Sequence, residues 1–163
     1  MYSSLILEII VREALIDDLK SIQLLNKKLF EGEFDKYDDT INVDWPLSKE
    51  GEKFYEERIS GSEGCAFVLV KGEEIIGYLV GSLSKDEFYR NVKEIAELDE
   101  MYILEEYRNG GHGSLLYSKS LEWCKEKGVK RLKVLVTAKN KQAINFYKKK
   151  GFDDYNVTLE RDV

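Results

Sequence analysis

Residues 107–114 read Tyr-Arg-Asn-Gly-Gly-His-Gly-Ser, and three of the five residues from 110 to 114 are glycine. This segment lies between an apolar, β-type run over residues 95–104 and a helical pattern over residues 115–127. Glycine lets the backbone adopt positive φ and approach a ligand closely, and a helix start presents free N–H groups with a partial positive charge. The arrangement therefore predicts an anion site suited to a phosphate or pyrophosphate.

The spacing of the glycines excludes two common phosphate loops. A Walker loop ends in Gly-Lys-Ser/Thr, and no lysine follows Gly113. A dinucleotide fingerprint reads G-x-G-x-x-G, but counting from Gly111 the last position is Leu116. The spacing that remains is Arg108-x-x-Gly111-x-Gly113.

A second block follows downstream, where the strand-like residues 134–136 precede Asn140, Ala143, Phe146-Tyr147 and Gly151-Phe152. The two blocks together resemble the GNAT superfamily of acetyl-CoA-dependent N-acetyltransferases. That family has a Gln/Arg-x-x-Gly-x-Gly/Ala loop and then a strand, N-x-x-A-x-x-F-Y and G-F. The resemblance covers residues 96–153 closely and the whole chain in element order. Glu105 departs from it, since the family often has a proline there.

The resemblance implies a site for acetyl-CoA without a metal. The pantetheine arm would pair with the backbone of Met101, Tyr102 and Ile103. The expected pyrophosphate and further cofactor contacts are Arg108, Asn109, Gly110, Gly111, His112, Gly113, Ser114, Asn140 and Tyr147. Two of these residues have a simpler interpretation. Asn140 would cap the following helix, and His112 would be an exposed loop residue without a role in binding. Residues 148–150 are a solvated lysine face, or one of them meets a cofactor phosphate.

The resemblance also implies direct attack of an amine on the thioester within a ternary complex. Tyr147 is the expected acid for the leaving thiolate, or else a packed aromatic residue. The candidates for the general base are Glu97, then Asp99, then Glu100. Alternation along a strand places Glu97 and Asp99 on one face and Glu100 on the other, unless a β-bulge changes the parity. Each of the three could instead be solvated or ion-paired, with water carrying the proton.

Hydrophobic periodicity predicts one domain over residues 1–163 with the order β-α-α-β-β-β-α-β-α-β. The expected fold is α+β with three layers. Its central sheet is mixed, mostly antiparallel, with six to seven strands, flanked by about four helices. Expected strands cover residues 6–11, 65–71, 74–83, 95–104, 131–137 and 155–160. Expected helices begin near Leu15, after Ser48, at Leu115 and after Asn140.

The composition of the chain argues against several classes of protein. The 163 residues carry a formal charge of −6, which argues against a nucleic-acid binder. No apolar run approaches the roughly 20 residues of a membrane span, and the N-terminus lacks signal-peptide features. Cys65 and Cys124 form no disulfide framework and are expected to be buried. We therefore expect a cytoplasmic protein.

The acceptor is the least defined part of the prediction. An acidic loop over residues 31–44 ends at Trp45 and would attract a cationic amine, or is simply solvated. Tyr37, Trp45 and Tyr89 could line the pocket. We expect an N-acetyltransferase that acts on a primary amine, either a small cationic amine or an amine of a protein or peptide, and leave open a homodimer. The alternatives are a non-catalytic acyl-CoA-binding module and a nucleotide-binding protein.

Overall fold

The computed structural model describes residues 7–85 and 87–163. Within this part of the chain, one five-stranded sheet has the order β1-β2-β3-β4-β5. Neighbouring strands are antiparallel except β4 and β5, which are parallel. The strands are β1 (Ile9–Glu13), β2 (Gly64–Lys71), β3 (Glu74–Leu83), β4 (Ile95–Ile103) and β5 (Arg131–Val134). The α-helices are α1 (Leu19–Lys36), α2 (Lys49–Ser60), α3 (His112–Glu126) and α4 (Lys141–Lys149).

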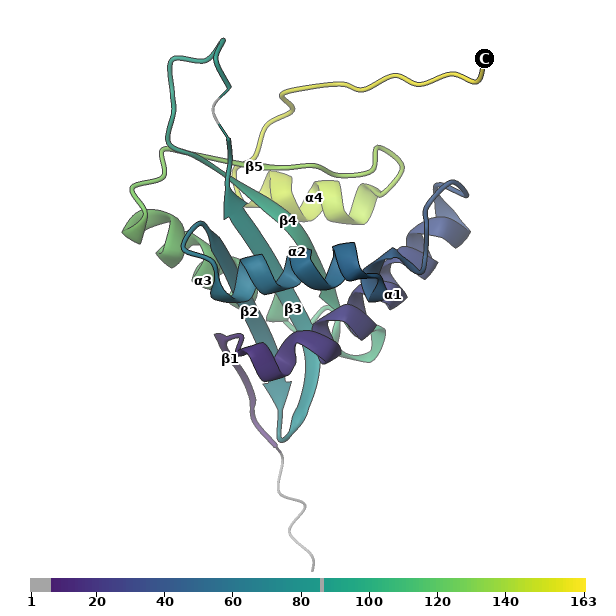
Figure 1. Ribbon diagram of the computed structural model, residues 1–163, viewed down its shortest axis with the longest axis vertical. Coiled ribbons are helices and arrows are strands. Elements are labelled where there is room, and N and C mark those ends of the chain that lie inside the picture. The colour runs from purple at the N-terminus through teal and green to yellow at the C-terminus, as the bar shows by residue number, and fades with distance from the viewer. Residues whose placement is uncertain (1–6, 86) are drawn as a thin grey trace, which may run out of the picture.

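The sheet separates two helical layers, with α1 and α2 on one face and α3 and α4 on the other (Figure 1). Each face has its own apolar core. Ile22, Tyr55, Val68 and Tyr78 belong to the core under α1 and α2. The opposite core holds Leu69, Leu79, Leu98, Leu116 and Tyr147, among others. The three-layer α+β architecture with a mixed, mostly antiparallel sheet is thus confirmed.

The prediction of six to seven strands was wrong, because the described residues form five. Residues 155–160 alternate in sequence but form no strand, and Tyr155, Val157 and Leu159 are 60%, 83% and 90% exposed. Alternation alone does not make a strand, because the backbone also needs an edge to pair with.

Several boundaries also shifted. The first strand is Ile9–Glu13, whereas the expected range began at residue 6, which lies outside the described residues. The first half of the expected acidic loop, including Glu31 and Glu33, belongs to α1. Helix α3 begins at His112, three residues before the expected Leu115, so Gly113 and Ser114 lie in its first turn. Strand β5 ends at Val134 instead of residue 137.

Helix α2 begins where the sequence predicts, because Ser48 caps it: its hydroxyl accepts a hydrogen bond from the Gly51 N–H at 3.1 Å. The first turn of α2 packs closely against the preceding 3-10 turn, Trp45–Leu47. A Cβ atom at Gly51 would overlap the carbonyl oxygen of Trp45 and lie 2.8 Å from that of Pro46. Glycine is therefore required here for close backbone packing.

An irregularity in β4 has the largest consequence for the site. Val80 of β3 lies opposite Glu100, but the next residue, Gly81, lies opposite Leu98. Asp99 is therefore an extra residue in β4, which is a β-bulge. Leu98 and Met101 both face the core under α3 and α4. Because of the bulge, Asp99 and Glu100 turn to the same face, toward α1 and α2.

None of the helices in the described ranges is both long enough and apolar enough to span a bilayer. Those ranges also contain no cluster of three or more His, Cys, Asp or Glu side chains arranged to hold a metal ion. Cys65 and Cys124 are free and buried, as predicted.

Two helical glycines give a matched test of the packing of α2. Gly51→Ala should destabilise the protein by about 1–3 kcal/mol, because the added methyl overlaps backbone that cannot move away. Gly32→Ala, in α1, should stabilise it by up to about 1 kcal/mol, because nothing lies within 4 Å and alanine favours the helix. Urea unfolding measures both. Equal midpoints for the two variants would contradict the close packing of α2 on the Trp45–Leu47 turn.

Candidate active site

The glycine-rich loop ends at an uncapped helix N-terminus. Gly111 occupies the N-cap position of α3 with φ of 81°, and no side chain from the described residues caps the helix. A Cβ at Gly111 would meet nothing within 4 Å, so the space beside it is open. Asn109, just before, also has positive φ, at 63°. The first amides of α3 are therefore free to bind an anion.

Helix α4 lies beside the uncapped start of α3. A Cβ at Gly113 would lie 3.3 Å from the Phe146 ring, so glycine allows α3 and α4 to approach each other. The ammonium of Lys150 donates a hydrogen bond to the Ser114 hydroxyl at 2.7 Å. Lys148 pairs instead with Asp154 at 3.1 Å. Of the three lysines that the sequence left open, Lys150 is the one at the start of α3.

Two contacts tie the loop to the end of β4. Arg108 Nε donates to the Ile103 carbonyl oxygen at 2.7 Å, and its guanidinium lies 5.1 Å from the centre of the Tyr102 ring. His112 Nδ1 lies 2.7 Å from the Tyr107 carbonyl oxygen. His112 is thus partly buried at the helix start, and the expectation of an exposed loop residue was wrong.

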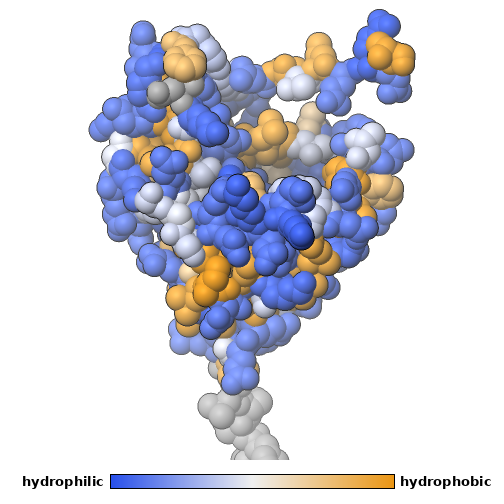
Figure 2. All heavy atoms as spheres, viewed as in Figure 1, coloured by the Kyte–Doolittle hydropathy of each residue, from blue (hydrophilic) through white to orange (hydrophobic). Residues whose placement is uncertain are grey.

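Beyond the loop, β4 has one edge without a strand partner. β4 pairs with β5 only over residues 95–98, whereas β3 pairs with β4 as far as Ile103. Among the described residues, no strand lies against the other edge of β4 at residues 99–103. The surface is hollowed above α2, with hydrophobic residues at its floor, and α4 and β5 lie behind this hollow (Figures 1 and 2).

The two predicted site residues on or before α4 have structural roles. Asn140 caps α4 by accepting from the Ala143 N–H at 3.1 Å, and its amide nitrogen donates to Glu33 of α1 at 3.3 Å. Tyr147 is buried in the core under α3 and packs edge-to-face on Phe152. Burial raises the pKa of Tyr147 to about 12.

Two of the three candidate carboxylates are ion-paired. Glu97 lies 3.4 Å from Lys133 of β5 and is partly exposed. Asp99, at the bulge, accepts from Arg58 Nε at 3.0 Å and from the Ser82 hydroxyl at 3.1 Å. Simple alternation, with Glu97 and Asp99 on one face and Glu100 on the other, does not hold here. The β-bulge that the sequence left open as an alternative is present, and it turns Glu100 to the face of Asp99.

Glu100 differs from both, because it is enclosed by neutral hydrogen-bond donors. Its Oε2 atom accepts from the Tyr55 hydroxyl at 2.5 Å, from the Asn26 amide at 2.8 Å and from the Tyr78 hydroxyl at 3.1 Å. Asn26, Tyr55 and Tyr78 are themselves fully buried. No described residue donates to Oε1.

Burial raises the pKa of Glu100 above its ordinary value. The nearby negative charge of Asp99 raises it further, whereas the hydrogen bonds from Tyr55, Tyr78 and Asn26 lower it. Burial also raises the pKa values of Tyr55 and Tyr78, so both hydroxyls remain protonated donors. Glu100 is thus a carboxyl group with a raised pKa, which suits a group that accepts a proton from an amine.

Two aromatic side chains lie beside Tyr55, Trp45 of the 3-10 turn and Phe54 of α2. Trp45 stacks on Phe30 with ring centres 5.9 Å apart and meets Phe54 and Tyr55 edge-on. Of the residues expected near an acceptor, Trp45 thus packs next to a neighbour of Glu100. Tyr89, by contrast, is 76% exposed on the segment before β4.

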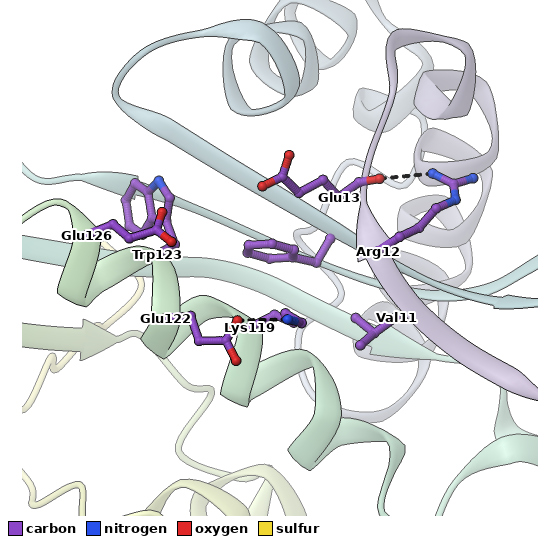
Figure 3. Close-up of a pocket in the computed structure, with 8 residues that line it drawn as sticks. Val11, Arg12, Glu13, Lys119, Glu122, Trp123 and Glu126 are labelled. Carbon is purple, nitrogen blue, oxygen red and sulfur yellow. Dashed lines mark hydrogen bonds and ion pairs between the residues drawn. The ribbon is translucent and has the colours of Figure 1, made fainter.

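A separate hollow of about 320 Å³ lies between β1 and α3, at the opposite edge of the sheet from β5 (Figure 3). Val11, Phe67 and Trp123 line it together with charged residues such as Glu122. It contains none of the predicted site residues.

The sequence did not reveal the residues that surround Glu100. Asn26, Tyr55 and Tyr78 come from α1, α2 and β3, and lie 22 to 74 positions from Glu100 along the chain. Their spacing matches the core faces of their own elements, and no local pattern marks them. Only the packing of both helices on the sheet brings them together.

The fold agrees with comparisons to known proteins. Residues 26–152 match the model of the acetyltransferase (GNAT) family, and the chain belongs to that family. An uncharacterised N-acetyltransferase, MJ1207, from Methanocaldococcus jannaschii is 29% identical over 150 residues, which are 90% of this chain and 62% of that protein. An N-alpha-acetyltransferase from Sulfurisphaera tokodaii is 29% identical over 111 residues, 64% of this chain and 65% of that protein. The chain therefore spans less than two thirds of both relatives.

Solved structures share the fold at low sequence identity. A tetramutant of the BH1408 protein from Bacillus halodurans superposes with a TM-score of 0.81 at 21% identity, covering 94% of this chain and 99% of that one. The aminoglycoside acetyltransferase AAC(6')-Iy, in complex with the bisubstrate analogue CoA-S-monomethyl-acetylneamine, has a TM-score of 0.75 at 16% identity, with 96% and 99% covered.

Proposed function

We propose that this chain is an N-acetyltransferase that transfers the acetyl group of acetyl-CoA to a primary amine. The observation that carries the proposal is the uncapped, glycine-rich start of α3 beside the unpaired edge of β4. The first offers backbone amides to a pyrophosphate, and the second offers backbone groups to an extended amide chain. Acetyl-CoA contains both parts, and family membership agrees.

In this proposal, different residues around the loop bind different parts of acetyl-CoA. The backbone from Asn109 to Ser114 would hold the pyrophosphate, with Lys150 adding a positive charge beside Ser114. The backbone from Met101 to Ile103 would pair with the pantetheine arm. Arg108 would hold the loop on β4 through the Ile103 carbonyl oxygen. Asn140 acts indirectly, by capping α4.

The transfer needs a base for the incoming ammonium and an acid for the leaving thiolate. In the proposal the base is Glu100, ahead of Glu97 and Asp99, because those two are ion-paired, whereas Glu100 is partly buried among neutral donors and has a raised pKa. Tyr147 is the proposed acid, and the described residues offer its hydroxyl no hydrogen-bond partner. The amine nitrogen forms the new C–N bond, the C–S bond breaks, and the thiolate takes the proton of Tyr147. The nitrogen loses its second proton as the amide forms, and that proton restores the Tyr147 hydroxyl.

The acceptor is proposed to be a cationic amine that enters over α1 and α2. The carboxylate of Glu100 faces these helices, and Trp45 packs beside its neighbour Tyr55. The class of acceptor stays open between an aminoglycoside and a protein N-terminus. The neighbour AAC(6')-Iy points to the first, and the relative named an N-alpha-acetyltransferase points to the second. A cytoplasmic location and a homodimer remain predictions.

The first test is ligand selectivity followed by turnover. Acetyl-CoA should raise the melting temperature, whereas ATP and NAD should not, and a panel of amines should release free CoA thiol. Lys150→Met should weaken acetyl-CoA binding, because it removes a charge beside the proposed pyrophosphate. Lys149→Met, one residue away on the exposed face of α4, should not.

Stabilisation by ATP or NAD instead of acetyl-CoA would support a nucleotide-binding protein. Binding of acetyl-CoA without thiol release for any amine would support the non-catalytic module. Equal effects of the two lysine substitutions would remove Lys150 from the binding site.

Glu100→Gln should lower kcat by about 10²- to 10⁴-fold, because the base is lost while the shape of the side chain is kept. Glu97→Gln should cause a much smaller loss, since Glu97 pairs with Lys133. Steady-state kinetics at saturating acetyl-CoA measures both. The wild-type kcat should fall on the acid side as Glu100 becomes protonated, at a pH above the ordinary glutamate range. A larger loss for Glu97→Gln would reverse the assignment.

Tyr147→Phe should lower kcat with little change in the affinity for acetyl-CoA, because only the hydroxyl is removed and the ring still packs on Phe152. The comparison needs kcat from thiol release and Kd from calorimetry on the same preparation. Unchanged turnover would leave Tyr147 as a core residue only.

A further inference from the structure

The hydrogen bonds around Glu100 are asymmetric between its two carboxylate oxygens. All three donors reach Oε2, and none of the described residues donates to Oε1. Asn26 uses one amide hydrogen for Glu100 and the other for the Tyr78 hydroxyl, at 2.8 Å. Tyr78 then donates its own hydrogen to Oε2. When Glu100 is ionised, each polar hydrogen of the Asn26 amide and of the Tyr55 and Tyr78 hydroxyls therefore has one acceptor.

Oε2 already accepts three hydrogen bonds, so it has no room for a proton of its own. Oε1 accepts from none of the described residues and is therefore the oxygen open to an incoming proton. We infer that Asn26, Tyr55 and Tyr78 are positioning residues that hold Oε2 of Glu100, so that Oε1 is the atom that takes the proton from the acceptor amine. In that step an N–H bond of the ammonium breaks, an O–H bond forms at Oε1, and the nitrogen keeps the electron pair for its attack. This inference rests on the proposed function.

Asn26 supports a role beyond packing. Its side chain is fully buried, and its Oδ1 atom has no hydrogen-bond partner among the described residues. A buried polar atom without a partner destabilises a fold, so a core position without another role would favour an apolar residue. The amide is explained if its two hydrogens are needed for Glu100 and Tyr78.

The charged and titratable groups around Glu100 fix the direction of the expected effect. Asp99 of β4 faces it with a negative charge, which Arg58 of α2 pairs at 3.0 Å. Tyr55 of α2 and Tyr78 of β3 both donate to the ionised form. Removal of either hydroxyl therefore favours the protonated carboxyl and raises its titration midpoint.

The experiment titrates Glu100 directly in the full chain, without substrates. Carbon-13 NMR of the labelled glutamate carboxyls gives the midpoint, and Glu100→Gln assigns the signal. Tyr55→Phe and Tyr78→Phe should each move the midpoint upward. Tyr117→Phe removes a buried tyrosine hydroxyl on the opposite face of the sheet and should leave it unchanged. Unmoved midpoints in both test variants, or an equal shift in the control, would overturn the inference.

Asn26→Leu separates positioning from structure. It should raise the midpoint without lowering the urea concentration of half-unfolding, because it also removes the unpartnered Oδ1. Lower stability with an unchanged midpoint would mean that Asn26 is structural. If either phenylalanine variant fails to fold, the Glu100 midpoint in Asn26→Leu still tests the inference.

Kinetics then tests the link to catalysis. Tyr55→Phe should lower kcat about tenfold on the acid side of the pH profile and leave the alkaline plateau unchanged, as expected for loss of one hydrogen bond to a charged group. A uniform loss at every pH would contradict a role in positioning the base. If the wild-type chain transfers acetyl to no amine, the proposed function fails, whereas the NMR midpoints still decide whether these residues control Glu100.

Discussion

The extra residue at Asp99 in β4 determines how the core and the candidate site fit together. A regular strand would place Leu98 and Glu100 on one face, and the carboxylate would then enter the apolar core under α3 and α4. The bulge keeps Leu98 and Met101 in that core while it turns Asp99 and Glu100 toward α1 and α2. This one backbone irregularity thus allows β4 to contribute apolar residues to the core on one face and two carboxylates on the other face.

The bulge also lies where β4 loses its second partner. β5 pairs with β4 only as far as Leu98, and the unpaired edge begins at Asp99. A bulged strand bends and twists more strongly, which agrees with the separation of the two parallel strands at this point. The free edge and the uncapped start of α3 follow each other along the chain, so a single connection, residues 104–111, joins the two parts of the proposed acetyl-CoA site.

Local signals predicted most of the elements. Ser48 and Asn140 cap their helices as expected, and strand β3 has the expected bounds, because caps and alternation act over a few residues. The expected strand at residues 155–160 did not form, although its pattern is equally clear. The expected start of α3 was late, because Gly113 was assigned to the loop, whereas it lies in the first turn of the helix.

The sequence by itself determined the family and predicted an anion site, because the glycine spacing, the caps and the second motif each lie in short contiguous stretches of the chain. It also indicated three carboxylates on one strand, without a basis for choosing between them. Only the tertiary structure decided that Glu100 is the enclosed one. Its face depends on a register shift against β3, and its hydrogen-bond donors come from three distant elements. Glu100 can be distinguished from Glu97 and Asp99 only in the folded protein, because burial and hydrogen bonding depend on residues that are close in space and not in sequence.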